Sequence, residues 1–166
     1  MARAMRERGF TLLELIITMI VLMIFTMVAI PVAKNTIKRQ REIELRRALR
    51  ELRTAIDRYR QIADAGLVNR LRINPSEECM GGTIGTGCYP PDLDVLVEGV
   101  ELRGTTGRKI KLLREIPVDP MTGKAEWGLR SFQQDPEARS WDGLNVFDVY
   151  SLSDGVALDG TRYRDW

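Results

Sequence analysis

The most constraining feature of this 166-residue chain is an apolar run over residues 10–33 that carries one charge, Glu14. A helix over this run spans roughly 36 Å at about 1.5 Å per residue, enough to cross a hydrocarbon core of about 30 Å. A carboxylate inside such a layer is costly, so Glu14 either has a function there or lies near the interface and reaches water. The run therefore predicts a membrane helix whose single carboxylate needs an explanation.

A cleaved secretory signal is the main competing interpretation, because the run follows a short basic segment that contains Arg3, Arg6 and Arg8. The run is too long for the apolar part of a typical signal. It also lacks a cleavage site of small residues followed by a polar mature start, and "VAIPVAKN" is the nearest approach. A retained membrane segment is the better prediction.

The helical pattern continues beyond the apolar run. Apolar residues recur at spacings of three and four, the period of an amphipathic helix, and they are Leu45, Ala48, Leu49, Leu52, Ala55, Ile56, Tyr59, Ile62 and Ala63. No Gly or Pro lies between Ala33 and Gly66. We therefore expect one helix from residue 10 to about residue 65, with its first half in lipid or a helix bundle and its second half packed on a soluble domain.

The middle of the chain predicts mostly irregular structure. Residues 66–91 are rich in Gly and Pro and are expected to form a long loop. Residues 92–99, "DLDVLVEG", fit a short helix or a strand, and their spacing does not decide between the two. Residues 114–123, "REIPVDPMTG", predict a rigid turn.

The end of the chain predicts antiparallel strands. Residues 125–132, "AEWGLRSF", and 146–153, "VFDVYSLS", are short runs of aromatic and β-branched residues bounded by turn formers. Residues 161–166, "TRYRDW", are expected to add a third, short edge strand. The expected fold class is α+β, with a long N-terminal helix packed on a small C-terminal antiparallel β-sheet.

Composition argues against an enzyme. The chain has no histidine, which removes the commonest general base and metal ligand. "GTTGRK" at residues 104–109 has the wrong spacing for a phosphate-binding loop and predicts a polar turn. A membrane-anchored enzyme or metal-dependent hydrolase is the alternative, and its site would use carboxylates on turns: Asp92, Asp94, Asp119, Asp148 and Asp154.

Residues 34–60 carry ten basic and four acidic residues. Such a density of positive charge on one helix is an electrostatic footprint for nucleic acid. The favoured interpretation is the solvated face of an amphipathic stem with ion pairs such as Glu42 with Arg46. We therefore expect no nucleic acid partner.

The first residues also resemble a known signal. "RERG" is followed by "FTLLELIITMIVLMI", with Glu14 at the fifth position after Gly9 and Pro31 at the twenty-second. This pattern resembles the class III signal of type IV pilins and type II secretion pseudopilins. The resemblance implies that a prepilin peptidase cuts between Gly9 and Phe10 and methylates the new amino terminus. It also implies that Glu14 assists assembly, where the Phe10 ammonium of a neighbouring subunit could stabilise its carboxylate.

Further blocks resemble the major, G-type pseudopilin of the type II secretion system. They are "YPPDLDVLVEG", "LREIPVDPMTG", "FDVYSLSDG" and the terminal "DW". The resemblance implies a non-enzymatic subunit of a periplasmic pseudopilus. The partners that it implies are further copies of this chain, other pseudopilins, the prepilin peptidase and the inner-membrane assembly platform. The final segment is shorter than in that family, and a type IV pilin or a minor pseudopilin stays open as the alternative.

The resemblance divides the chain into a leader at residues 1–9, a membrane and assembly helix at 10–33, its amphipathic continuation at 34–65, an irregular region with a short helix at 66–124, and a sheet at 125–166. It implies a single-pass protein of the bacterial inner membrane whose C-terminal domain is periplasmic. Lys and Arg are in larger excess in residues 34–60 than in residues 1–9. A simple positive-inside count would therefore place the C-terminal side in the cytoplasm, against the orientation that the resemblance implies.

Two further expectations concern the periplasmic part. In the oxidising periplasm, Cys79 and Cys88 are expected to form a disulfide within the loop, with free thiols or a poor zinc site as alternatives. The major pseudopilin family holds a structural calcium ion in its final loop. Carried over, Leu152 would offer its carbonyl and Asp154 and Asp159 their carboxylates, although two Asp-Gly turns need no metal.

Overall fold

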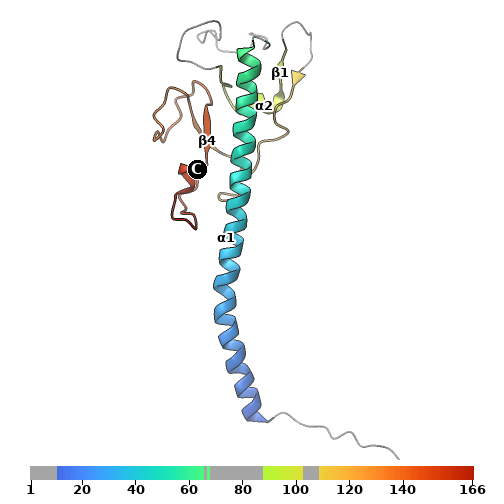
Figure 1. The fold of residues 1–166 in the computed structure, drawn as a ribbon, viewed down its shortest axis with the longest axis vertical. Coiled ribbons are helices and arrows are strands. Elements are labelled where there is room, and N and C mark those ends of the chain that lie inside the picture. The colour runs from blue at the N-terminus through green and yellow to red at the C-terminus, as the bar shows by residue number, and fades with distance from the viewer. Residues whose placement is uncertain (1–10, 66, 68–87, 103–108) are drawn as a thin grey trace, which may run out of the picture. The chain divides into compact units, whose positions relative to one another are not determined.

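The structure is a computed structural model that describes residues 11–65, 67, 88–102 and 109–166 (Figure 1). The chain divides into two units, Met1–Gln40 and Arg41–Trp166. Helix α1, Leu12–Asp64, contributes residues to both units. This helix confirms the continuous helix predicted from residue 10 to about residue 65.

The core of the second unit forms along one face of α1. Leu45, Leu49, Leu52 and Ile56 are each at most 2% exposed, and their spacing of three and four residues places them on a single stripe of the helix. The other predicted core positions of this helix are also buried, except that Ile62 is partly buried. The periodicity therefore identified the packed face correctly.

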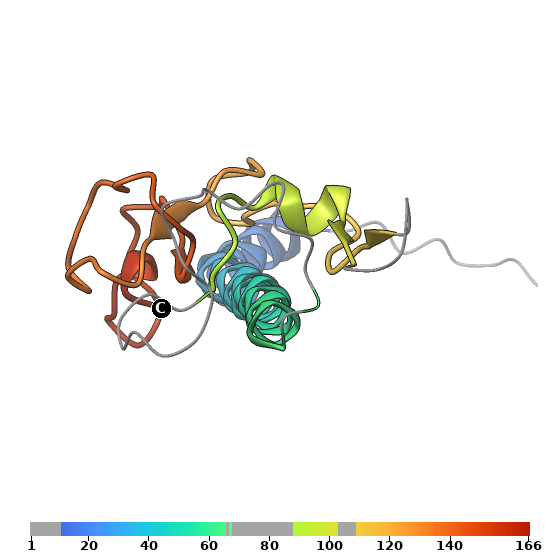
Figure 2. The ribbon, with the colours of Figure 1, turned by 90° about the horizontal axis from the view of Figure 1, so that it is seen from above.

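Apolar residues of the later segments complete this core. The most buried are Leu96, Val146 and Val149, each 0% exposed. Trp127 and Tyr163 belong to the same cluster. Figure 2 shows the segments that carry these residues flanking the part of α1 that follows Arg41.

Helix α2, Asp94–Glu98, resolves the ambiguity of residues 92–99 in favour of a helix. Asp92 Oδ1 accepts a hydrogen bond of 2.8 Å from the Val95 amide, which satisfies one free N–H group of its first turn. Gly99 ends the helix with φ +92°, a backbone conformation that favours glycine. The next residues form β1, Val100–Glu101, which pairs antiparallel with β2, Lys109–Ile110, a sheet that we did not expect.

The two predicted strands near the C-terminus are present as β3, Gly128–Arg130, and β4, Asp148–Tyr150. They pair antiparallel, with Gly128 opposite Tyr150 and Arg130 opposite Asp148. The Tyr150 ring lies over Gly128, because a Cβ built at that glycine would meet the ring at 2.2 Å. Together, the long helix and the small antiparallel sheets confirm the α+β, type IV pilin-like fold class.

The third strand expected at residues 161–166 is wrong. Val156 and Arg162 form an isolated bridge, and the chain then turns into a 3-10 helix, η2, Tyr163–Asp165. The Tyr163 side chain is 4% exposed and its hydroxyl donates to Glu42 of α1. This anchoring to α1 takes the segment away from an edge-strand path.

Candidate membrane and assembly site

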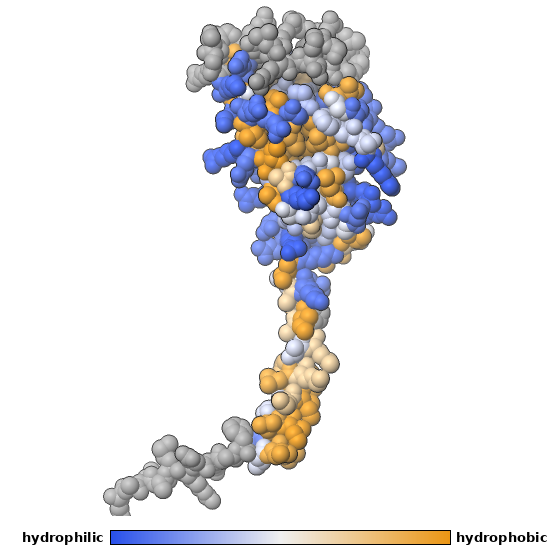
Figure 3. All heavy atoms as spheres, turned by 180° about the vertical axis from the view of Figure 1, so that it is seen from behind, coloured by the Kyte–Doolittle hydropathy of each residue, from blue (hydrophilic) through white to orange (hydrophobic). Residues whose placement is uncertain are grey.

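The first part of α1 exposes large apolar side chains. Between Leu12 and Val32 their exposed fractions run from 44% at Val21 to 79% at Leu12. Figure 3 shows these side chains as a hydrophobic surface along this part of the helix. By its length and composition, this helix could cross a membrane. Apolar surface of this extent is stabilised when lipid or another protein covers it.

Thr11 and Glu14 form the start of this helix. Thr11 Oγ1 accepts a hydrogen bond of 3.3 Å from the Glu14 amide, so Thr11 caps the first turn. Thr-x-x-Glu at a helix start is the capping-box pattern, and an acidic residue in the first turn is favoured by the helix dipole. Glu14 therefore has a local role in beginning the helix, in addition to the assembly role that the resemblance implies.

Glu14 remains the residue of this segment that calls for an outside partner. Thr18 and Thr26 donate their hydroxyl protons to backbone carbonyls of α1 at 2.9 and 2.7 Å, so the helix satisfies them itself. Within the part of the chain that the structure describes, no cation lies within ion-pair distance of the Glu14 carboxylate. A cation for this carboxylate would thus come from the undescribed N-terminal residues or from another molecule.

The structure describes only one of the other predicted residues of this site. Gly9 and Phe10, where cleavage and methylation are expected, lie outside the described residues. Pro31 lies within α1. The expected processing therefore stays a prediction.

Comparison with known families bears directly on this segment. Residues 4–30 match the family model described as the prokaryotic N-terminal methylation motif. The match includes Gly9, Phe10 and Glu14, and it shows that the chain carries a prepilin-type signal. No curated protein and no solved structure matches the chain. The signal and the exposed apolar helix support a membrane-anchored prepilin of the type IV pilin-like superfamily.

Three arginines of α1 hold the later segments of the second unit. Arg46, Arg53 and Arg60 are spaced by seven residues, which places them on one stripe of the helix. Arg46 contacts Asp159 at 3.4 Å and lies 4.1 Å from the centre of the Trp166 ring. Arg60 donates to the Tyr89 hydroxyl at 2.6 Å. The charge pattern predicted a solvated face for these cations, and their contacts become evident only from their partners in the folded chain.

Glu42 makes a second contact of this kind. Its Oε1 accepts hydrogen bonds from the Leu158 amide at 2.8 Å and from the Tyr163 hydroxyl at 3.0 Å. Burial of the phenol, together with the hydrogen bond and the negative charge of Glu42, raises the pKa of Tyr163 to about 12. The expected pair of Glu42 with Arg46 is therefore replaced by contacts of each residue with the C-terminal segment.

The two carboxylates expected to hold calcium have other partners. The Asp154 carboxylate is 91% exposed and lies 3.3 Å from Arg164 Nη2. Asp159 accepts hydrogen bonds from the Thr161 hydroxyl and amide, which hold the pKa of Asp159 below its ordinary value. The described residues contain no group of three or more acidic or cysteine side chains placed to hold a metal. As arranged here, these donors do not supply the six to eight ligands of a calcium ion, and calcium binding stays a prediction.

The cysteine pair is half described. Cys88 is 5% exposed and belongs to the core of the second unit, beside Tyr89. Cys79 lies outside the described residues. The disulfide between them therefore stays a prediction.

The carboxylates of the alternative enzyme site have separate structural partners. Asp119 is fully buried and accepts hydrogen bonds from the Ser151 hydroxyl at 2.6 Å and from the Met121 amide at 2.7 Å. Asp148 pairs with Arg53, and Asp92 caps α2. Asp119, Asp148 and Asp92 therefore stabilise three different elements, and the described residues do not gather three of these carboxylates at one metal-binding position.

Proposed function

We propose that this chain is a structural subunit of a type II secretion pseudopilus, assembled from the inner membrane after a prepilin peptidase cleaves between Gly9 and Phe10. The C-terminal unit then lies in the periplasm. Its partners are further copies of this chain, other pseudopilins and the inner-membrane assembly platform. Its role is mechanical, since the filament moves other proteins and this chain performs no reaction.

The match of residues 4–30 to the methylation motif carries this proposal. It explains why a carboxylate follows closely after the leader in an otherwise apolar helix. The exposed apolar side chains of Leu12 to Val32 supply a surface that can be covered first by lipid and then by other subunits. In such a bundle, the desolvated Glu14 carboxylate is stabilised by the amino terminus of a neighbouring Phe10.

The choice of a pseudopilus over a pilus rests on the blocks after the stem. "IPVDPMTG" folds as a turn whose buried Asp119 also binds Ser151, just after β4. "YPPDLDVLVEG" contains α2, and its Leu96 is fully buried. These blocks thus contribute buried residues to the second unit, and the choice of a pseudopilus rests on their resemblance to the major pseudopilin.

Deletion of the gene, with complementation, tests the proposal. Loss of exoprotein secretion that is restored by the wild-type chain is the expected result. Glu14→Gln should still be processed but should restore little secretion, because the amide cannot pair with the Phe10 ammonium. Thr18→Val is the matched control, since the Thr18 hydroxyl is bonded within its own helix. Loss of twitching motility or DNA uptake with normal secretion would instead indicate a type IV pilin.

A further inference from the structure

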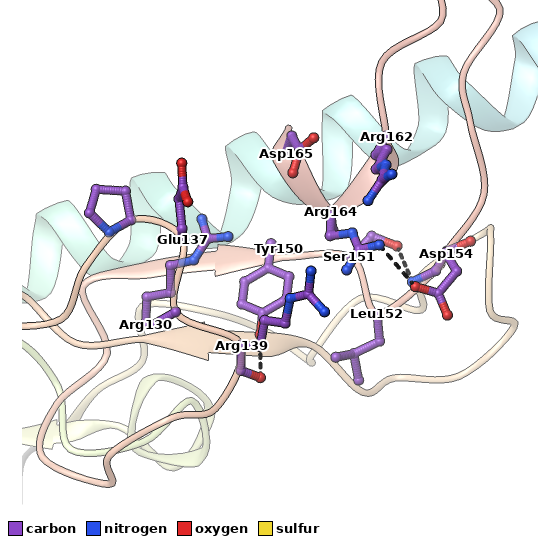
Figure 4. Close-up of a pocket in the computed structure, with 13 residues that line it drawn as sticks. Arg130, Glu137, Arg139, Tyr150, Ser151, Leu152, Asp154, Arg162, Arg164 and Asp165 are labelled. Atoms are coloured by element: carbon purple, nitrogen blue, oxygen red, sulfur yellow. Dashed lines mark hydrogen bonds and ion pairs between the residues drawn. The ribbon is translucent and has the colours of Figure 1, made fainter.

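Four arginines line a pocket of about 620 Å³ in the second unit. They are Arg130 at the end of β3, Arg139 in the loop that follows it, and Arg162 and Arg164 in the C-terminal segment (Figure 4). The volume lies within the range of small-molecule sites, about 300 to 1,000 Å³. Neither the membrane helix nor the assembly residues account for this pocket.

Three carboxylates also line the pocket: Glu137, Asp154 and Asp165. Of these three, Asp154 forms an ion pair with a pocket arginine in the described structure, at 3.3 Å from Arg164, and Asp148, outside the lining, forms one with Arg130 at 4.0 Å. Asp154 is itself 91% exposed, so water screens much of this pair. Among the described residues, Arg139 and Arg162 therefore have no paired carboxylate.

Two of the guanidinium groups have buried nitrogens without an acceptor. The Nε atoms of Arg130 and Arg164 are buried and have no hydrogen-bond partner in the described structure. Arg130 lies 4.3 Å from the centre of the Tyr150 ring, and its Nη1 is 4.0 Å from Asp148 Oδ2. Buried polar groups are nearly always paired, so two such nitrogens beside one pocket are unusual.

The other two arginines are exposed and unpaired. Within the described part of the chain, the guanidinium groups of Arg139 and Arg162 have neither an ion pair nor a hydrogen bond. Figure 4 shows the Arg139 guanidinium beside Tyr150 and Arg162 next to Arg164. The pocket thus combines two arginines with incomplete hydrogen bonding, Arg130 and Arg164, and two unpaired arginines, Arg139 and Arg162. They come from two separate segments of the sequence.

We propose that this pocket binds a small molecule that carries two or more oxyanion groups, carboxylate or phosphate. The planar guanidinium matches both groups through paired N–H donors. More than one anionic group is expected, because Arg130 and Arg139 come from one segment and Arg162 and Arg164 from another. Binding supplies acceptors to the exposed guanidinium groups of Arg139 and Arg162, which lack them in the described structure. This proposal does not depend on the assembly function.

The test uses the full chain in detergent micelles, titrated with citrate and with inorganic pyrophosphate at constant ionic strength. Calorimetry should show saturable binding of at least one of them at one site per chain. The melting temperature should rise with ligand concentration by mass action. Arg139→Gln/Arg162→Gln should weaken binding tenfold or more while melting normally in chloride alone. Arg139→Gln and Arg162→Gln alone should each weaken binding less than the double variant. If the double variant does not fold, the two single variants are used for the comparison.

Arg41→Gln is the matched control, because Arg41 is exposed and lies outside the pocket lining. It should bind both probes as the wild type does. Absence of saturable binding, or equal affinity in the wild type and the pocket variants, would overturn the proposal. Binding of a poly-glutamate peptide without binding of either small anion would also overturn it, since the pocket would then be a docking surface for protein.

Discussion

Arg53 of α1 and Asp148 of β4 form a two-point ion pair, with Nε and Nη2 donating to the two carboxylate oxygens at 2.7 and 3.3 Å. The same Nη2 donates to the backbone oxygens of Val149 and Trp166 at 3.2 and 2.6 Å. One arginine therefore joins α1 to β4 and to the last residue of the chain. Arg53 lies within the second unit. Its guanidinium donates to backbone oxygens of β4 and of the C-terminal segment, short elements with few hydrogen bonds of their own.

Arg53→Met should lower the free energy of unfolding by about 1 to 3 kcal/mol, because the partly buried Asp148 carboxylate and two backbone oxygens lose a charged donor. Asp148→Asn should cost less, and the two changes together should be less than additive, with a coupling of about 1 kcal/mol. Urea unfolding in micelles measures all three. Asp64→Asn is the control, since its pair with Arg60 is exposed and should change stability by less than about 0.5 kcal/mol. Strict additivity would mean that Arg53 and Asp148 do not interact.

The Tyr163 hydroxyl is expected to make the free energy of unfolding depend on pH in the alkaline range. Its pKa is raised to about 12 from an ordinary value of 10.0, so the folded state favours the neutral phenol. This contribution is fully present below pH 10 and is lost as the pH rises toward 12. Tyr163→Phe should be less stable than the wild type at pH 8, by about 1 kcal/mol for the lost hydrogen bond to Glu42. The difference should shrink between pH 10 and pH 12, and a difference that stays constant over that interval would contradict the raised pKa.

Gly128→Ala should disrupt the contact between β3 and β4. The added methyl group would meet the Tyr150 ring at 2.2 Å, which forces the ring or the strand to move. Overpacking of this kind costs about 1 to 3 kcal/mol. Thermal unfolding measures the loss, and Gly128→Ala/Tyr150→Leu should recover part of it because the ring is gone. Full stability of the single variant would show that the ring does not cover this glycine.

The Cys79–Cys88 disulfide is expected in protein purified from its native compartment. Closing a loop of this size contributes about 2 to 3 kcal/mol in the chain-entropy model. Peptide mapping by mass spectrometry without reductant should find the two cysteines in one linked species. Complete alkylation of both thiols before reduction would rule the bridge out.

The sequence predicted what depends on local pattern. Leu45, Leu49 and Ile56 lie on one helix face because of their spacing alone, and no distant residue is needed to recognise it. The prepilin signal around Gly9 and Glu14 is equally local. The β3 and β4 strands were recognisable because Gly128 to Arg130 and Asp148 to Tyr150 lie in runs of suitable composition between turns.

The features that were missed depend on contacts between distant segments. Tyr163 bonds to Glu42, 121 residues away, and this contact replaced the expected edge strand with η2. The strands β1 and β2 each have 2 residues, which is too short for a periodic signal. The pocket arginines were unpredictable for the same reason, because nothing in the spacing of Arg130 and Arg164 shows that they share one cavity.

The most direct measurement of the central claim is the mass of the amino-terminal peptide of the mature protein from its native membrane. Cleavage after Gly9 should produce a peptide that begins at Phe10 and carries one N-methyl group. Gly9→Val should leave the leader attached, because the peptidase needs a residue without a bulky side chain at the bond that it cuts. An intact Met1 in the wild-type protein, or an amino terminus near Ala33, would contradict the assignment of this chain as a prepilin.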